Sequence, residues 1–229
     1  PYFHPDVNWY DLVLRDFSAQ QQHNLNLSGG TDNTRYFISL GYFDQSGAYD
    51  VQDVQTAYSA NPRFKRYNFR SNFDIDFNKD FSASVKLSGQ FTDSNFPGIG
   101  AGDIFFRLLN TNPMMNPGII DGMLISGVEG LPSSSGSPLD AIVNNGYQRN
   151  FGSTLNTNVS LKHKLDFITE GLSVRGMVAY DNYYQHNVRR SKETMRYRIV
   201  RDPEDPELPV FLPQGMDAPF SFGEGYERN

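Results

Sequence analysis

The residue types that could carry chemistry in this chain of 229 residues fall into three small groups. The first is a glycine-rich run at residues 98–103, which superficially resembles a phosphate cradle. It precedes a short helix expected over residues 104–109, with Asp103 as its N-cap. A dinucleotide site needs a buried parallel strand before the glycines, whereas the strand expected here is amphipathic and Pro97 interrupts the approach. We therefore interpret the run as a loop followed by a helix cap.

The second group consists of possible metal ligands. Four acidic residues spaced by prolines could bind calcium through oxygen: Asp202, Glu204, Asp205 and Glu207. The glycine-centred spacing of an EF-hand loop is missing, so a solvated acidic loop is the favoured interpretation. The histidines are scattered without metal-ligand spacing, at His4, His23, His163 and His186, and the chain has no cysteine. We expect no metal and no cofactor.

The third group, a serine-rich run at residues 133–137, raises the question of a nucleophile. Nothing nearby supplies a base that could activate a serine, so the run is interpreted as a flexible loop tip. No other nucleophile or acid–base pair stands at a recognisable spacing, so we predict no catalytic residue and no enzymatic activity. The net charge of −6 and the pI near 5.2, without a basic cluster, also argue against a nucleic-acid partner.

The strongest pattern lies in the elements that would position these groups. Residues 66–77, 81–92 and 155–167 alternate polar and apolar side chains, with no apolar residue on the polar positions. Because side chains of a strand point alternately to opposite faces, each stretch predicts a β-strand with one apolar and one hydrated face. Strands of soluble proteins run about 5 to 6 residues, whereas a tilted membrane-spanning strand needs about 9 to 11. The lengths favour part of a large antiparallel transmembrane β-barrel.

The connections between the predicted strands support this fold. We predict about six strands, at residues 22–30, 34–43, 64–77, 81–93, 154–167 and 172–185. Short turns rich in Asn, Asp and Gly join them in pairs, while the segments 44–63, 94–153 and 186–229 are predicted as long loops. Short periplasmic turns and long external loops are typical of outer-membrane barrels. The sequence has no apolar stretch of about 18 residues, which excludes a transmembrane helix.

The alternation assigns each strand residue to a face of the barrel wall. We expect the apolar positions to face lipid: Tyr36, Ile38, Leu40, Tyr42, Phe69, Phe73, Ile75, Val85, Leu87, Val159 and Leu161. We expect the polar positions to face the lumen: Arg66, Arg70, Asn72, Asp74, Lys86, Asn158 and Arg175. Aromatic residues such as Phe81 and Phe91 flank the apolar positions, as in the girdles that barrels place at both membrane interfaces.

The predicted strands are too few to stand alone in a membrane. The smallest single-chain barrels use about 8 strands, and an open sheet would expose unpaired edges to lipid. The sequence also starts without an initiator Met or a signal peptide. We therefore expect the chain to be a piece of a longer protein.

Several motifs in order resemble a known family. They are WYDLVLR at residues 9–15, QQQHNLNLSGG at 20–30, TRYFISLGYFDQSG at 34–47, FKRYNFRSN at 64–72 and NNGY at 144–147. These resemble the early barrel of SusC-like (RagA-like) TonB-dependent transporters of Bacteroidetes. The resemblance implies a plugged barrel of about 22 strands in the outer membrane of a Gram-negative bacterium. It also implies energy from TonB through a plug and TonB box outside this sequence, and import of glycan or peptide fragments beneath a SusD-like surface lipoprotein.

The segment 94–153 is longer than a strand connection requires, and loops beyond about 12 to 15 residues are usually functional or disordered. This one carries apolar side chains that would be poorly hydrated in a loose loop. We predict that it contacts substrate or the lid through Phe105, Phe106, Arg107, Leu109, Met114 and Met115. The alternative is that these residues only pack against neighbouring loops. At the level of function, the alternative is a non-transport surface protein, either a barrel adhesin or a glycan-binding module.

Overall fold

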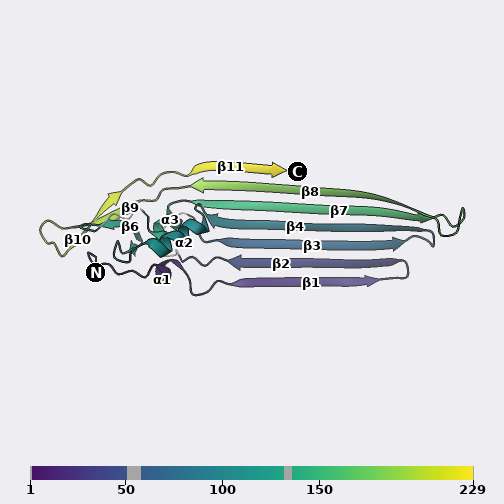
Figure 1. Ribbon diagram of the computed structural model, residues 1–229, viewed down its shortest axis with the longest axis horizontal. Coiled ribbons are helices and arrows are strands. Elements are labelled where there is room, and N and C mark those ends of the chain that lie inside the picture. The colour runs from purple at the N-terminus through teal and green to yellow at the C-terminus, as the bar shows by residue number, and fades with distance from the viewer. Residues whose placement is uncertain (1, 51–57, 132–135, 229) are drawn as a thin grey trace.

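The computed structural model describes residues 2–50, 58–131 and 136–228. One antiparallel sheet dominates them, and its strands run side by side along the long axis of the molecule (Figure 1). Its seven strands follow one another in the order β1 (Gln20–Gly30), β2 (Thr34–Ser46), β3 (Arg63–Asp76), β4 (Phe81–Pro97), β7 (Tyr147–Lys164), β8 (Ser173–Ser191) and β11 (Ser221–Arg228). The predicted all-β antiparallel fold is confirmed, and the sheet does not close on itself.

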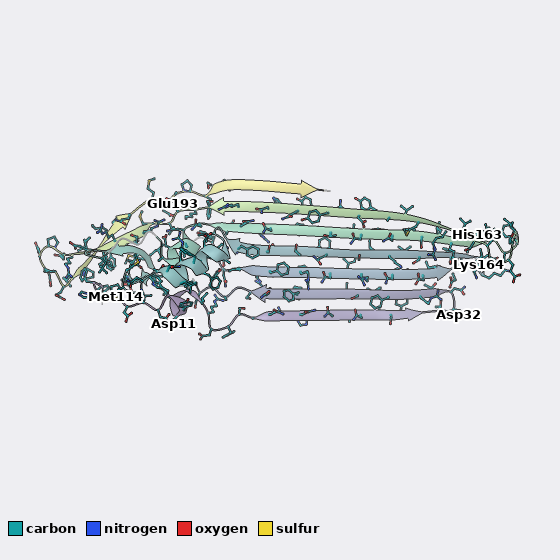
Figure 2. The ribbon with its side chains drawn as sticks, viewed as in Figure 1. Asp11, Asp32, Met114, His163, Lys164 and Glu193 are labelled. Atoms are coloured by element: carbon teal, nitrogen blue, oxygen red, sulfur yellow. The ribbon has the colours of Figure 1, made fainter. Side chains whose placement is uncertain are left out.

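The two ends of the sheet differ. At one end, here called the turn end, short turns rich in Asn, Asp and Gly join the strands. Asn78 closes the β3–β4 turn, because its Oδ1 accepts hydrogen bonds from the backbone N–H groups of Asp80 (2.9 Å) and Phe81 (2.8 Å). Gly171 stands at φ 79° in the β7–β8 turn, a conformation that glycine adopts without strain. His163 and Lys164 also lie at the turn end (Figure 2).

The opposite end, here called the cap end, carries a second substructure, the cap (Figure 1). Its helices are α1 (Trp9–Val13), α2 (Ala101–Asn110) and α3 (Pro138–Val143). Its small sheet has the order β10 (Pro209–Gln214), β9 (Arg196–Arg201), β6 (Met123–Val128) and β5 (Ile119–Ile120). Helix α3 begins after Ser137, whose Oγ accepts a hydrogen bond from the backbone N–H of Asp140 (3.1 Å), and Pro138 fits the first turn.

The buried core of the described chain lies in the cap and in the segments leading into it, not in the long sheet. One cluster gathers around Trp9, Ile104 and Ile142, and a second around Ile125 and Ile199. Among the described side chains of the long strands, no Phe, Tyr, Leu, Ile, Val or Met is buried; on β8, for example, Val178 is 72% exposed. Burying one such side chain stabilises a protein by about 1.5–3 kcal/mol. The sheet would therefore be stabilised by an apolar environment that covers these exposed side chains. Within the described ranges, no helix is long and apolar enough to cross a membrane.

Most strands extend beyond their predicted ends toward the cap, which corrects all three predicted loops; the segment 44–63 contains the end of β2 and the first residue of β3. The segment 94–153 contains the end of β4 and the start of β7 in addition to α2, α3, β5 and β6. The segment 186–229 contains the end of β8, β9, β10 and also β11, which pairs with β8 as the seventh strand of the long sheet. Both of these last predictions failed because they relied on alternation of polar and apolar side chains, which ends near residue 93 and is missing from β11. The backbone pairing between strands continues in both places.

Helix α2 corrects a further prediction. Its N-cap is Gly100 rather than Asp103, which lies in the first turn of the helix. The acidic side chain still suits that position, because the positive end of the helix dipole is there.

Candidate functional site: the two faces of the sheet and the cap

The strand register places the residues predicted to face lipid on one face of the sheet. Tyr36 pairs with Phe73, which pairs with Val85, which pairs with Val159. Directly paired residues share a face, and so do residues two apart on one strand. By that rule the same face also holds Ile38, Leu40, Tyr42, Phe69, Ile75, Leu87 and Leu161. The register thus brings all of these side chains together, and their contact with lipid stays a prediction.

The residues predicted to face the lumen share the opposite face. Asn72 pairs with Lys86, which pairs with Asn158. Arg175 joins them through its register partner Lys162, which pairs with Ser82 and so with Asp76. The same rule places Arg66, Arg70 and Asp74 there. A hollow of about 490 Å³ against the sheet is lined by hydrogen-bonding side chains that include Asn24, Ser39, Asn68, Arg70, Gln90 and Asn156. This face can donate and accept many hydrogen bonds.

Aromatic rings border the apolar face at both ends. At the turn end, Phe81 lies 5.3 Å from Phe77 and 5.9 Å from His163, measured between ring centroids. Toward the cap end, Tyr42 and Tyr67 lie 5.2 Å apart, and Tyr67 pairs with Phe91 in the register. Phe81 and Phe91 are separated by ten residue steps on β4, or roughly 33 Å along the strand at about 3.3 Å per residue. With the tilt of about 45° usual for membrane strands, the apolar band would be about 23 Å tall, close to the ~25 Å of known barrels.

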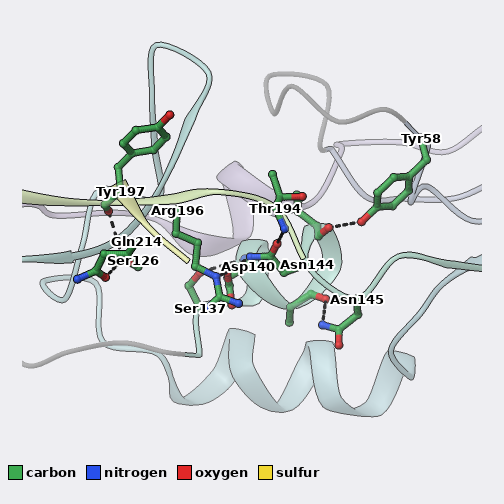
Figure 3. Close-up of polar contacts among 12 residues, drawn as sticks. Tyr58, Ser126, Ser137, Asp140, Asn144, Asn145, Thr194, Arg196, Tyr197 and Gln214 are labelled. Atoms are coloured by element: carbon green, nitrogen blue, oxygen red, sulfur yellow. Dashed lines mark hydrogen bonds and ion pairs between the residues drawn. The ribbon is translucent and has the colours of Figure 1, made fainter. Parts of the chain in front are cut away.

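Polar contacts join the segments of the cap that are far apart in the sequence (Figure 3). The Nε of Arg196 lies 2.9 Å from Oδ1 of Asp140, which also accepts a hydrogen bond from Nδ2 of Asn144 (2.6 Å). The backbone N–H of Thr194 donates to Oδ1 of Asn144 (2.6 Å). These contacts tie α3 to the strand that follows β8. Burial raises the pKa of Asp140, and the nearby Arg196 guanidinium acts in the opposite direction.

Sequence reasoning missed this network. The residues stand far apart in the chain and carry no motif, so only the fold brings them together. One local signal was available: a serine followed by a proline and, three residues on, an acidic residue is a helix-start pattern, and Ser137, Pro138 and Asp140 match it. Ser137 is therefore a buried helix cap, not part of a flexible loop tip. Ser133–Ser135 of that predicted loop lie outside the described residues.

Helix α2 presents two contrasting faces. Ile104 and Leu108 are buried in the core of the cap. Phe105, Phe106 and Leu109 point outward, and the last two are 66% and 73% exposed. Arg107 is half-buried in the last turn. Of the predicted methionine contacts, Met114 is exposed in the cap (Figure 2), and Met115 is half-buried. The structure thus gathers exposed apolar side chains on one side of α2.

The other candidate sites are explained by local packing. At Gly98 a Cβ atom would lie 1.7 Å from the carbonyl oxygen of Asn145, so the glycine permits close backbone contact rather than cradling a phosphate. Asp202 accepts hydrogen bonds from the backbone N–H groups of Glu204 (2.8 Å) and Asp205 (3.3 Å), which is a turn motif. Among the residues that the structure describes, no group of His, Asp or Glu side chains could hold a metal ion.

Comparisons with known proteins bear on these features. No family model matches the chain. The TonB-dependent receptor P26 of Formosa agariphila is 25% identical over 116 residues, covering 51% of this chain and 10% of its own length. The TonB-dependent receptor P3 of the same organism is 28% identical over 106 residues, covering 43% and 10%. The chain therefore spans about a tenth of these curated relatives.

Solved structures of the RagAB peptide importer share the fold. Its closed-closed state matches with a TM-score of 0.58 and 20% identity, over 90% of this chain and 21% of the solved chain. Its open-open state matches with a TM-score of 0.59 and 21% identity, over 89% and 21%. In sequence and in fold, the chain is thus similar to part of a SusC-like (RagA-like) TonB-dependent receptor, as its motifs predict.

Proposed function

We propose that this chain forms part of the wall and the outer cap of a TonB-dependent transporter in the outer membrane of a Gram-negative bacterium. The transporter imports glycan or peptide fragments together with a SusD-like surface lipoprotein. Its energy comes from TonB, through a plug and TonB box outside this sequence. The observation that carries the proposal is the sheet itself, which has one hydrated face and one apolar face with aromatic rings at both borders.

The exposure of the sheet supports placement in a membrane. An apolar face this long would be a severe aggregation hazard in water, whereas lipid would cover it without any further protein. The free edges at β1 and β11 would be intolerable in lipid, so we expect further strands to pair with them in the whole protein. The hydrated face would then line a lumen or contact the plug.

The exposed side of α2 supports a partner at the cap. Phe105, Phe106, Leu109 and Met114 are large apolar side chains on the surface of the cap, whereas Ile104 and Leu108 of the same helix lie in its core. Exposed apolar patches with polar surroundings are typical of protein contacts. In the proposed transporter these side chains contact the lid lipoprotein or the substrate, with Arg107 beside them.

Uptake by cells that depend on the full-length protein tests the proposal. Cells carrying the intact gene should take up glycan or peptide fragments only when TonB is present. Phe106→Asp and Leu109→Asp should lower uptake and reduce co-purification of the lid lipoprotein, because each places a charge in an apolar contact. Leu208→Asp is the matched control, since Leu208 is an exposed leucine in the β9–β10 turn.

Two results would contradict the proposal at different levels. Uptake of the fragments that does not require TonB would contradict a TonB-driven importer. Unchanged uptake and unchanged recovery of the lid lipoprotein in both α2 variants would contradict only the partner contact. The exposed side of α2 would then have no role in binding the lid or the substrate. Deletion of the whole segment 113–136 is a poorer test, because Leu124, Ile125 and Val128 belong to the cores of the cap.

A further inference from the structure

The apolar face of the sheet ends at the aromatic border near the cap, and the next positions on the same side of the sheet carry charged side chains. Lys65 follows Tyr67 on that face of β3, and Asp93 follows Phe91 on β4. Asp44 follows Tyr42 on β2 and pairs with Lys65 in the register. One position further toward the cap, the same face carries Arg63, Asn95 and Arg149, which pair with one another across β3, β4 and β7. We call these six residues the charged collar: Asp44, Arg63, Lys65, Asp93, Asn95 and Arg149.

The collar surrounds a cavity of about 450 Å³. Five of its residues line the cavity, and Tyr58, Ser59 and Tyr147 complete the lining. The rings of Tyr58 and Tyr147 lie 5.6 Å apart at the side nearer the cap. The cavity is therefore flanked by the aromatic border of the apolar face on one side and by tyrosine rings on the other.

The collar has two ion pairs and one further cationic side chain, Lys65. Nε and Nη2 of Arg63 lie 3.0 and 2.8 Å from the carboxylate oxygens of Asp44. Nε and Nη2 of Arg149 lie 3.0 and 2.7 Å from those of Asp93. Lys65 lies between these pairs and has no ion pair with any described residue. Both arginine side chains remain more than half exposed, at 53% and 63%, so part of each guanidinium can still donate to a ligand.

We propose that the charged collar binds the phosphate of a lipid headgroup in the outer leaflet. The inference relies on the proposed function, because it takes the apolar face to be the lipid-facing side of the wall. Aromatic rings of a membrane protein sit at headgroup level, so the position just beyond them is where lipid phosphates lie. The Lys65 ammonium supplies the uncompensated charge, and the free N–H groups of the two arginines donate to phosphate oxygens.

The location also distinguishes a lipid from a free phosphate ion. A lipid bound here would place its acyl chains along the apolar face below the collar, over Tyr67 and Phe69. Burial of those chains adds favourable free energy that inorganic phosphate lacks. The cavity should therefore prefer a phosphorylated lipid to phosphate alone.

Binding of lipid A to the purified full-length protein tests the inference. Diphosphorylated lipid A and its dephosphorylated form should be titrated separately in neutral detergent. Lys65→Gln should weaken binding of the phosphorylated form about fivefold, which corresponds to the ~1 kcal/mol typical of one basic side chain near a membrane surface. Lys86→Gln is the matched control: it removes the same charge from the hydrated face, and binding should not change. Added salt should weaken binding to the wild-type protein.

Three outcomes would overturn the inference. They are equal binding of the two lipid A forms, equal binding by wild type and Lys65→Gln, and displacement of the lipid by equimolar inorganic phosphate. Insertion into vesicles of neutral phosphatidylcholine separates this failure from failure of the proposed function. A protein that inserts there but does not distinguish the lipid A forms lacks only the phosphate site, whereas one that does not insert lacks the lipid-facing wall.

Discussion

Adjacent residues on β3 offer a sharp test of which face of the sheet meets lipid. Phe73 lies on the apolar face, and its register partner Val85 stands four residues from Phe81 and six from Phe91. With about 3.3 Å per residue and a tilt of about 45°, Phe73 would lie ~9 Å from the inner aromatic border and ~14 Å from the outer one. Phe73→Arg then puts a charge near the middle of the membrane, where the expected cost in folding free energy is about 2–4 kcal/mol.

Asn72→Arg introduces the same side chain one residue away, on the hydrated face. Its register partner is Lys86, so like-charge repulsion across the strands should cost only about 0.2–1 kcal/mol. Denaturant titrations of the full-length protein in lipid vesicles give the free energy of unfolding for both variants. A larger penalty at Asn72 than at Phe73 would reverse the faces, since a shift of one residue exchanges them. Equal penalties would refute the membrane placement of the sheet.

Further predictions concern topology, backbone strain and pH. Cysteine at Glu204, in the β9–β10 turn, should react with a membrane-impermeant thiol reagent on whole cells, whereas cysteine at Lys79 in the β3–β4 turn should not; the reverse result would invert the topology. Gly146→Ala should destabilise by about 1–3 kcal/mol or more, because φ is 69° and its Cβ would lie 1.8 Å from the Arg190 carbonyl oxygen. Gly102→Ala should not destabilise the protein, because the added Cβ meets nothing within 4 Å. Equal thermal stabilities of the two variants would contradict this argument. Burial raises the pKa of Asp140, so at neutral pH its charged carboxylate lowers the free energy of unfolding. This loss of stability shrinks as pH falls through the raised pKa and is absent below the pKa of the unfolded state. Hydrogen exchange in α3 should therefore slow in the wild type relative to Asp140→Asn on acidification; a difference independent of pH would argue against this.

All strands of the long sheet except β11 could be predicted from the sequence, because their information is local. Alternation in β3, for instance, fixes which side chains share a face, and the short turn to β4 then sets the register of that pair. The cap could not be predicted in the same way. Trp9 shares one core cluster with Ile142, and Phe3 shares the other with Ile199, although more than a hundred residues separate each pair and no periodic pattern connects them. The charged collar could not be predicted for a related reason, because Arg63 and Arg149 stand in segments predicted as loops, beyond the end of the side-chain alternation.

The contacts at the base of the cap bear on how the proposed transporter would open. The Tyr58 hydroxyl donates to the backbone carbonyl of Val143 in α3 and accepts from the backbone N–H of Gly146 (3.1 Å), just before β7. On the other side, Arg189 of β8 donates to the carbonyl of Gly98, between β4 and α2 (2.9 Å). These part-buried hydrogen bonds hold α3 to the segment before β3, that segment to the residue before β7, and β8 to the loop before α2. Leaving such groups unpaired costs about 1–3 kcal/mol each. Moving the cap alone would break several at once. We therefore expect the cap to serve as a fixed platform, with opening carried out by a partner that moves against the exposed side of α2.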